Sequence, residues 1–159
     1  MSIRAIFFDV DGVLTDGRLY IDESGRELKV FDTKDGHGIK MALAAGVKVA
    51  WISGRTSGAT VLRARELGVR AVKQGVKEKG TAVRDYLSRW KLEPAEAAAC
   101  GDDLPDLALF DACGFSACPA DAVPAVRKRA DLVLKNAGGH GAVREFVEEV
   151  LRRNEAEPR

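Results

Sequence analysis

The feature that most constrains the fold of this chain is a set of three short apolar runs, each bordered by a polar turn. The runs cover residues 5–10, 47–52 and 97–100, and aspartate, serine or glycine residues mark the end of each run. A strand that is apolar on both faces is typical of the middle of a parallel sheet covered by helices. The sequence therefore predicts three central parallel strands whose carboxyl ends carry polar groups.

Segments with the period of amphipathic helices separate these runs. The predicted helices cover residues 36–45, 57–67, 77–90, 104–112 and 142–153. Weaker strands are expected near residues 70–72, 115–118 and 132–134. This alternation predicts an α/β fold, a Rossmann-like, doubly wound parallel sheet with helices on both faces.

One segment interrupts the alternation. Residues 18–31 contain two short apolar stretches around a polar turn, which predicts a β-hairpin that projects from the sheet. The length is that of one domain, which we expect over residues 1–153, followed by a flexible tail over residues 154–159.

The charge is nearly balanced, with 25 Lys and Arg residues against 24 Asp and Glu residues. No strong overall field would attract nucleic acid or an anionic membrane, so we predict neither partner. We interpret Arg127-Lys128-Arg129 as a solvated face, with a small nucleic-acid patch as the alternative. The three cysteines lack disulfide or zinc spacing, and no segment has the ~20 apolar residues that span a bilayer, so a cytoplasmic protein is expected.

Polar side chains gather where the three central strands end. Asp9 and Asp11 mark the first end, Ser53 the second, and Asp102 the third. In open parallel sheets, ligands bind outside these ends, although ordinary turn chemistry would explain any one of the residues alone. Several crowded carboxylates favour a hard cation, and an all-oxygen set favours Mg²⁺ over zinc. A further aspartate would then be free to attack phosphorus.

These motifs together resemble the haloacid dehalogenase superfamily of phosphohydrolases. The matching features are Asp9-Val10-Asp11-Gly12-Val13, the serine after the second strand, a downstream lysine, and Gly101-Asp102-Asp103-Leu104-Pro105-Asp106. The resemblance covers nearly the whole chain, and the order and spacing of the motifs carry it. It implies that Asp9 is the nucleophile and Asp11 the acid/base.

The resemblance also implies which residues would hold the phosphoryl group and the metal. Ser53 would donate a hydrogen bond to the phosphoryl oxygens, and Lys79 would neutralise them. Asp9, Asp102 and the main-chain carbonyl of Asp11 would bind Mg²⁺. Asp103 and Asp106 would support this metal shell.

The spacing between the motifs leaves no room for the cap domain that usually selects the substrate in this superfamily. This capless layout resembles the 3-deoxy-D-manno-octulosonate 8-phosphate phosphatases of lipopolysaccharide synthesis, through residues 12–17, 32–39 and 138–145. That resemblance implies a homotetramer in which the hairpins pack together and neighbouring subunits help to close each active site.

A sugar acid with a phosphate at one end and a carboxylate at the other needs a cation beyond the phosphate pocket. The candidates for this cation are Arg55, which follows Ser53 and Gly54 after the second central strand, and Arg63. The alternative is that both are ordinary surface arginines. Asp35 and His37 lie at a predicted helix start and are further candidates for substrate contact. The alternative for His37 is a solvated histidine at a helix end.

Three other interpretations use the same residues. A phosphatase for a nine-carbon, sialic-acid-type 9-phosphate would share the machinery, and Arg55 discriminates because such enzymes tend to have an acidic residue there. A non-catalytic oligomeric regulatory domain is disfavoured because the implied catalytic residues are all present. A mutase is disfavoured because, without a cap, water reaches the aspartyl-phosphate.

The segment before the last helix contains Gly138-Gly139 and His140. The glycine pair predicts either a mobile loop whose amides meet an anion or a plain turn. We do not assign His140 as a metal ligand.

Overall fold

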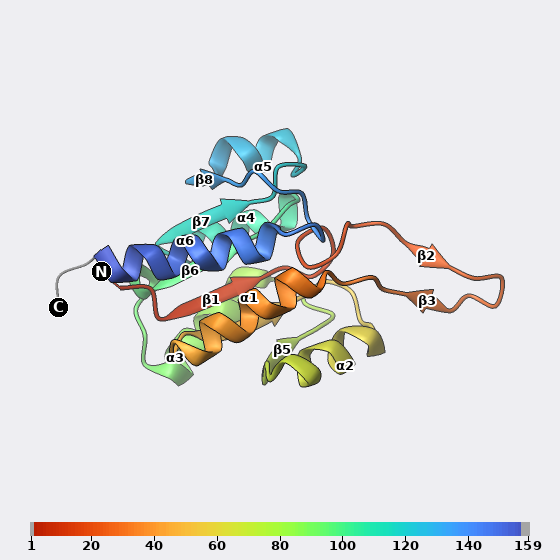
Figure 1. Ribbon diagram of the computed structural model, residues 1–159, viewed down its shortest axis with the longest axis horizontal. Helices are drawn as coiled ribbons and strands as arrows, with labels where there is room; N and C mark the ends of the chain where they lie inside the picture. The colour runs from red at the N-terminus through yellow and green to blue at the C-terminus, as the bar shows by residue number, and fades with distance from the viewer. Residues whose placement is uncertain (1, 157–159) are drawn as a thin grey trace.

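The computed structural model describes residues 2–156 and is built on a six-stranded parallel sheet (Figure 1). Its strands are β1 Ala5–Phe8, β4 Lys48–Ile52, β5 Ala71–Lys73, β6 Ala97–Cys100, β7 Phe115–Cys118 and β8 Leu132–Val133. The order across the sheet is β5-β4-β1-β6-β7-β8, and all neighbouring strands are parallel. The chain moves outward in one direction from β1 to β5 and in the other from β6 to β8. The end of β1 is therefore the switch point at which such sheets bind ligands, and the predicted fold class is confirmed.

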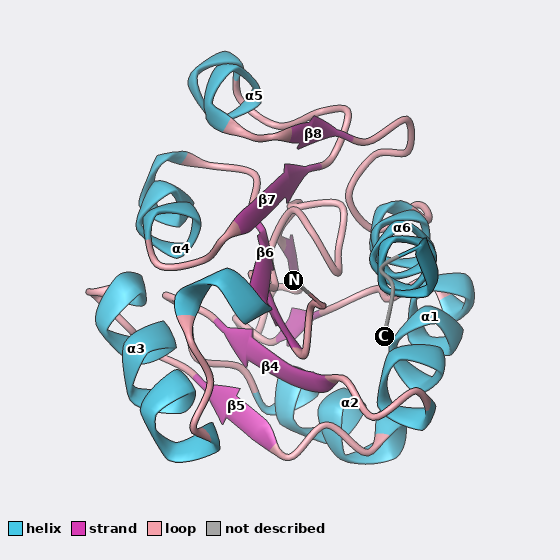
Figure 2. Cartoon of the chain, turned by 90° about the vertical axis from the view of Figure 1, so that its left-hand side faces the viewer, coloured by secondary structure: helices cyan, strands magenta, loops and turns pink. Residues whose placement is uncertain are grey.

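Helices cover both faces of the sheet (Figure 2). One face carries α1 Thr33–Ala44, α2 Gly58–Leu67 and α6 Ala142–Ala156, and the other carries α3 Lys79–Trp90, α4 Leu107–Asp111 and α5 Pro124–Arg129. Within the described residues, none of these helices has both the length and the apolar character needed to cross a bilayer.

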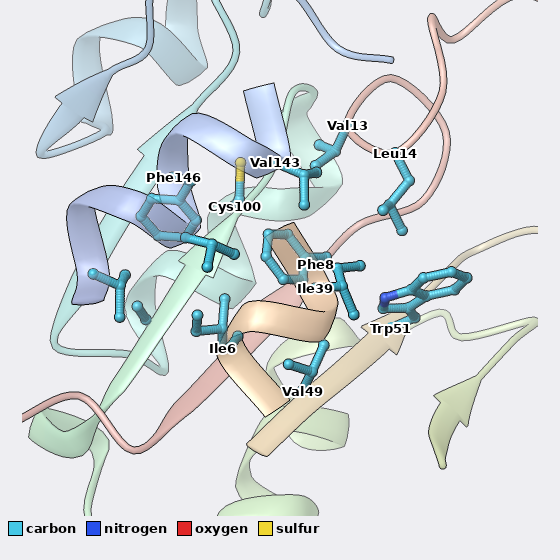
Figure 3. Close-up of a cluster of buried hydrophobic side chains, with 14 of the residues drawn as sticks. Ile6, Phe8, Val13, Leu14, Ile39, Val49, Trp51, Cys100, Val143 and Phe146 are labelled. Carbon is cyan, nitrogen blue, oxygen red and sulfur yellow. The ribbon is translucent and has the colours of Figure 1, made fainter. Parts of the chain in front are cut away.

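Alternating side chains of β1 enter two separate cores. Ile6 and Phe8 pack under α1 and α6, where Phe8 meets Phe146 edge-on at a ring-centroid distance of 6.1 Å (Figure 3). Ala5 and Phe7 pack on the opposite face. This double burial explains the unbroken apolar run, and it anchors the strand that leads into Asp9.

The projecting hairpin is also confirmed, although its strands are shorter than expected. β2 Tyr20–Ile21 and β3 Glu27–Leu28 pair antiparallel and extend beyond the sheet (Figure 1). A two-stranded ribbon without a covering layer supports little regular pairing, which explains why each strand has only two residues. Its exposed apolar side chains are Leu19, Tyr20, Ile21, Leu28 and Val30.

Three differences from the predicted elements have local causes. Helix α6 continues to Ala156 because the Asn154 side chain bonds both the N–H and the carbonyl of Ile3, at 2.7 and 2.8 Å. Residues 157–159 of the expected tail lie outside the described residues. Two short elements were not predicted from the sequence, the 3-10 turn Pro94–Glu96 and α5. Helix α5 is too short to show a period, and its Arg127, Lys128 and Arg129 are exposed.

Candidate active site

A cleft of about 420 Å³ lies at the carboxyl ends of the central strands. Its lining residues are Asp9, Asp11, Gly17, Gly54, Arg55, Val76, Lys77, Lys79, Asp102, Asp103, Pro105 and Asp106. A larger hollow, of about 610 Å³, lies at the amino ends of β4 and β5, and its lining includes Lys48, Arg70 and Trp90 but no carboxylate. The smaller cleft is the one that gathers groups able to perform chemistry.

Lys79 forms the centre of a buried ionic cluster in this cleft. Its Nζ lies 2.6 Å from Asp9 Oδ1 and 2.5 Å from Asp106 Oδ1, and all three side chains are almost fully buried. Asp9 follows β1 directly, while Lys79 is the first residue of α3. Two other lysines, Lys73 and Lys77, lie nearby in the sequence. Lys73 pairs with Asp85 and not with a carboxylate of this cluster.

Asp106 organises the turn that carries Asp102. Its second oxygen accepts the backbone N–H groups of Asp102 and Asp103, at 2.9 and 3.2 Å. A Cβ on Gly101 would lie 2.3 Å from Asp106, so only glycine permits this approach. The Asp103 carboxylate accepts the N–H of Leu104 at 2.8 Å and caps the short 3-10 turn Leu104–Asp106. The structure thus brings Asp106 to the cluster but uses the Asp103 side chain locally.

The carboxylates of Asp9, Asp102 and Asp106 fit a hard cation. Each has an oxygen within 4.8 Å of the others, and among the ion pairs of residues 2–156 only Lys79 brings an ammonium to this group, through Asp9 and Asp106. Within the described part of the chain, Asp102 Oδ1 is buried without a hydrogen-bond partner, which is costly for a polar atom unless an ion satisfies it. Both oxygens of Asp106 are engaged, whereas among the hydrogen bonds of the described residues the Asp9 carboxylate uses only Oδ1, so Asp9 and Asp102 are the carboxylates with an oxygen left to offer a cation.

The crowding also appears in the acidities of these groups. Burial, and then the charge of Asp106, raise the pKa of Asp9 to about 7, although Lys79 opposes the change. Burial, and then the charge of Asp9, raise the pKa of Asp102 to about 9. A bound cation would favour both charged forms and reverse these shifts.

Asp11 lies at the rim of the cleft and contacts a residue that the sequence analysis missed. Its Oδ1 accepts a hydrogen bond from Lys29, which follows β3 in the hairpin segment. Lys29 also lies 2.9 Å from Glu27. The signal available in the sequence was the alternation of Glu27, Leu28, Lys29 and Val30, which puts both charged residues on one side.

Arg55 lines the cleft beside Gly54, whereas Ser53 is buried at the end of β4. The Ser53 hydroxyl accepts the N–H of Arg55 at 3.1 Å, which shapes the turn after the strand. The Arg55 guanidinium donates to Glu27 of the hairpin at 2.8 Å.

The other three candidates for substrate contact do not line the cleft of their own chain. Arg63 donates to Glu66 at 2.7 Å and packs so closely on Gly36 that a Cβ there would lie 2.4 Å from its Nη2. Asp35 is buried and accepts the N–H groups of Gly141 and Arg144, at 3.3 and 2.9 Å, so that it caps α6. Burial nevertheless raises the pKa of Asp35. His37 is exposed on α1.

The Gly138-Gly139 segment does not offer free amides to an anion. The N–H of Gly138 donates to Asp121 at 3.0 Å, and that of Gly139 donates to the carbonyl of Val13 at 3.0 Å. A Cβ on Gly138 would lie 1.8 Å from the carbonyl oxygen of Gly12. The glycine pair therefore exists because two backbones meet there, and the anion-loop interpretation is wrong.

The comparisons with known proteins agree with this geometry. Residues 60–146 match the haloacid dehalogenase-like hydrolase family. The chain is 41% identical over 150 residues to the 3-deoxy-D-manno-octulosonate 8-phosphate phosphatase of Escherichia coli K12, covering 94% of this chain and 80% of that protein.

Two solved structures superpose closely. The 3-deoxy-D-manno-octulosonate 8-phosphate phosphatase of Yersinia pestis has a TM-score of 0.94 and 37% identity, covering 96% of this chain and 83% of that one. The corresponding Moraxella catarrhalis enzyme, in complex with a magnesium ion, a phosphate ion and KDO, has a TM-score of 0.93 and 35% identity, covering 96% and 88%. The resemblance predicted from the motifs is confirmed. The chain belongs to the haloacid dehalogenase-like hydrolases and, within them, to the family of the 3-deoxy-D-manno-octulosonate 8-phosphate phosphatases.

Proposed function

We propose that this chain is a magnesium-dependent phosphatase that converts 3-deoxy-D-manno-octulosonate 8-phosphate to 3-deoxy-D-manno-octulosonate and phosphate in lipopolysaccharide biosynthesis. The observation that carries the proposal is the buried Asp9–Lys79 pair beside Asp102, in a chain 41% identical to an enzyme of that name.

The residues of the cleft supply a two-step phosphoryl transfer. A carboxylate oxygen of Asp9 attacks phosphorus, the ester P–O bond breaks, and Asp11 gives a proton to the leaving sugar oxygen. Water then attacks phosphorus, loses a proton to Asp11, and releases phosphate and free Asp9. Lys79 neutralises charge on the phosphoryl group. The turn that begins at Ser53 lies beside the same phosphoryl group.

Asp9 and Asp102, with the main-chain carbonyl of Asp11, are the groups proposed to hold Mg²⁺. The unpartnered oxygen of Asp102 supports this set. When bound, Mg²⁺ supplies positive charge that offsets the charge of the phosphoryl oxygens. Asp106 holds these proposed ligands in place without binding the ion itself. It accepts hydrogen bonds from Lys79 and from the backbone N–H groups of Asp102 and Asp103.

Arg55 is the proposed contact for the carboxylate end of the substrate. Arg55 lines the cleft, and its guanidinium already donates to one carboxylate, that of Glu27, at 2.8 Å. A guanidinium has further N–H groups with which to bind a second carboxylate, that of the substrate. A nine-carbon acid sugar 9-phosphate is the competing substrate and would use the same catalytic groups.

We also propose that the protein is a cytoplasmic homotetramer assembled through the hairpins. The exposed apolar side chains of Leu19, Ile21 and Leu28 support association, because a lone hairpin gains order when it is covered. Free thiols at all three cysteines are compatible with a reducing compartment. Since Asp35, His37 and Arg63 do not line the cleft of their own chain, the substrate contacts proposed for them would be made at a neighbouring subunit's cleft.

The test is phosphate release from a panel of phosphomonoesters, with and without Mg²⁺. The panel contains the eight-carbon and nine-carbon keto-acid phosphates and simple sugar phosphates. We expect Mg²⁺-dependent release with the highest kcat/KM for the eight-carbon acid. A higher kcat/KM for the nine-carbon acid would make that acid the substrate in place of the eight-carbon one. The absence of release from every ester would reject the proposal that the chain is a phosphatase.

A further inference from the structure

The hairpin segment carries one lysine, Lys29, whose side chain is buried against the active site. Leu28 and Val30 are 61% and 52% exposed as whole residues, whereas Lys29 between them is only half-buried as a residue but has a side chain that is 4% exposed. Successive side chains of an extended segment point to opposite sides, so Lys29 faces inward because its neighbours face solvent. Ammonium groups are rarely buried unless they are paired, and the partners of Lys29 therefore indicate its role.

Those partners connect the two rims of the cleft. Lys29 donates a hydrogen bond to Oδ1 of Asp11. Its Nζ also lies 2.9 Å from Oε1 of Glu27. The other oxygen of Glu27 accepts from Arg55 at 2.8 Å. The hairpin segment thus joins the acid/base residue on one rim to Arg55 on the other.

We propose that Lys29 is a positioning residue that acts through Asp11, holding Oδ1 so that Oδ2 faces the oxygen that leaves the phosphorus. This inference rests on the proposed phosphatase function and adds to it a role for the hairpin within its own chain. Among the hydrogen bonds of the described residues, Oδ2 of Asp11 takes part in none, so it is free for proton transfer.

The physical reason is orientation. Asp11 lies in the turn after β1, and its side chain is 22% exposed, so burial alone does not fix its carboxylate. Proton transfer to a leaving oxygen depends on the distance and angle of the donor, and a fixed partner on the other oxygen limits rotation. Arg55, through Glu27, keeps the hairpin lysine in place.

The test compares leaving groups in the variant Lys29→Met, with Mg²⁺ present. The first substrate is the best alkyl phosphate of the panel, whose leaving oxygen needs a proton. The second is p-nitrophenyl phosphate, whose phenolate leaves without one. The quantity is kcat/KM, which reports on the steps up to formation of the aspartyl-phosphate.

We expect kcat/KM for the alkyl phosphate to fall by about tenfold or more, a fraction of the usual effect of a general acid, and kcat/KM for p-nitrophenyl phosphate to change by less than about threefold. The ratio of the two values does not depend on the fraction of folded enzyme. Lys29→Arg keeps the charge and should restore the ratio. Lys73→Met, which breaks the exposed pair with Asp85, is the matched control and should leave both values unchanged.

Equal losses for both substrates, or no loss for either, would overturn the role of Lys29. These outcomes differ from a failure of the proposed function, in which the wild-type chain itself would release no phosphate from any alkyl ester.

Discussion

The ammonium of Lys79 lies 2.6 Å from the carboxylate of Asp9, although 70 residues separate the two in the chain. The pair joins the end of β1 to the start of α3, and the same ammonium lies 2.5 Å from Asp106. One cation therefore serves both the packing of the fold and the charge balance around the proposed nucleophile.

Replacing this cation should destabilise the protein strongly. Lys79→Met leaves two buried carboxylates without their partner, and we expect a loss of about 3–5 kcal/mol in the free energy of unfolding. Urea unfolding in EDTA measures it. Lys77→Met, at an exposed neighbouring position, is the control and should lie within about 0.5 kcal/mol of wild type. Equal midpoints for the two variants would show that the buried pair contributes nothing to stability.

The proposed nucleophile should be replaceable without loss of the fold. Asp9→Asn keeps the size of the side chain, and we expect kcat to fall by more than about a thousandfold. Circular dichroism should remain that of the wild type, and Asp111→Asn, at the exposed pair with Arg129, should keep full activity. Substantial turnover in Asp9→Asn would reject the assignment of the nucleophile.

The stability of the metal-free protein should fall as the pH rises. Folding raises the pKa values of Asp9 and Asp102 from 3.8 to about 7 and about 9. A raised carboxyl pKa contributes stability that is complete below the unfolded value and is lost as the pH rises through the folded value. Urea unfolding in EDTA at pH 6 and pH 9 should therefore show lower stability at pH 9.

Two comparisons check the origin of that loss. Asp102→Asn removes one titrating group, so its stability should fall less between pH 6 and pH 9. Added Mg²⁺ should stabilise the wild type more at pH 9 than at pH 6, because the proposed ligands Asp9 and Asp102 are then more fully charged. Parallel pH dependences of the wild type and Asp102→Asn would contradict this account.

The contact between Gly138 and Gly12 should be sensitive to a single methyl group. A Cβ on Gly138 would lie 1.8 Å from the carbonyl oxygen of Gly12, next to Asp11. We expect Gly138→Ala to cost about 1–3 kcal/mol and to lower kcat by displacing this loop. Gly58→Ala, where a Cβ would meet no described atom within 4 Å apart from its chain neighbours and its own helix backbone, should be neutral or slightly stabilising. Thermal unfolding and phosphate release distinguish the two variants.

Asp35 should behave as a helix cap. Asp35→Ala removes the acceptor for the N–H groups of Gly141 and Arg144, and we expect a loss of about 1–2 kcal/mol with little change in KM. Denaturant unfolding and steady-state kinetics on the same samples check this. A raised KM at unchanged stability would instead support substrate contact, as the sequence analysis predicted.

The elements near the chemistry were predictable because their signals are local. The runs before Asp9, Ser53 and Asp102 are apolar on both faces, and each meets a polar turn, so the strand ends could be located from the sequence. Short elements such as α5 show no such signal, since six residues with one buried side chain, Val126, do not complete a pattern.

By itself the sequence determined the doubly wound sheet, the family and the residues that carry the proposed chemistry, because periodicity and motif order are properties of neighbouring residues. Only the tertiary structure decided which partners those residues have. Asp35 lies 106 and 109 positions from the amides that it caps, and Lys29 reaches Asp11 only because the hairpin turns the chain back toward the residues that follow β1. Such contacts depend on how helices and loops pack in space, and a side chain's position along the chain does not specify which distant backbone or charge will satisfy it.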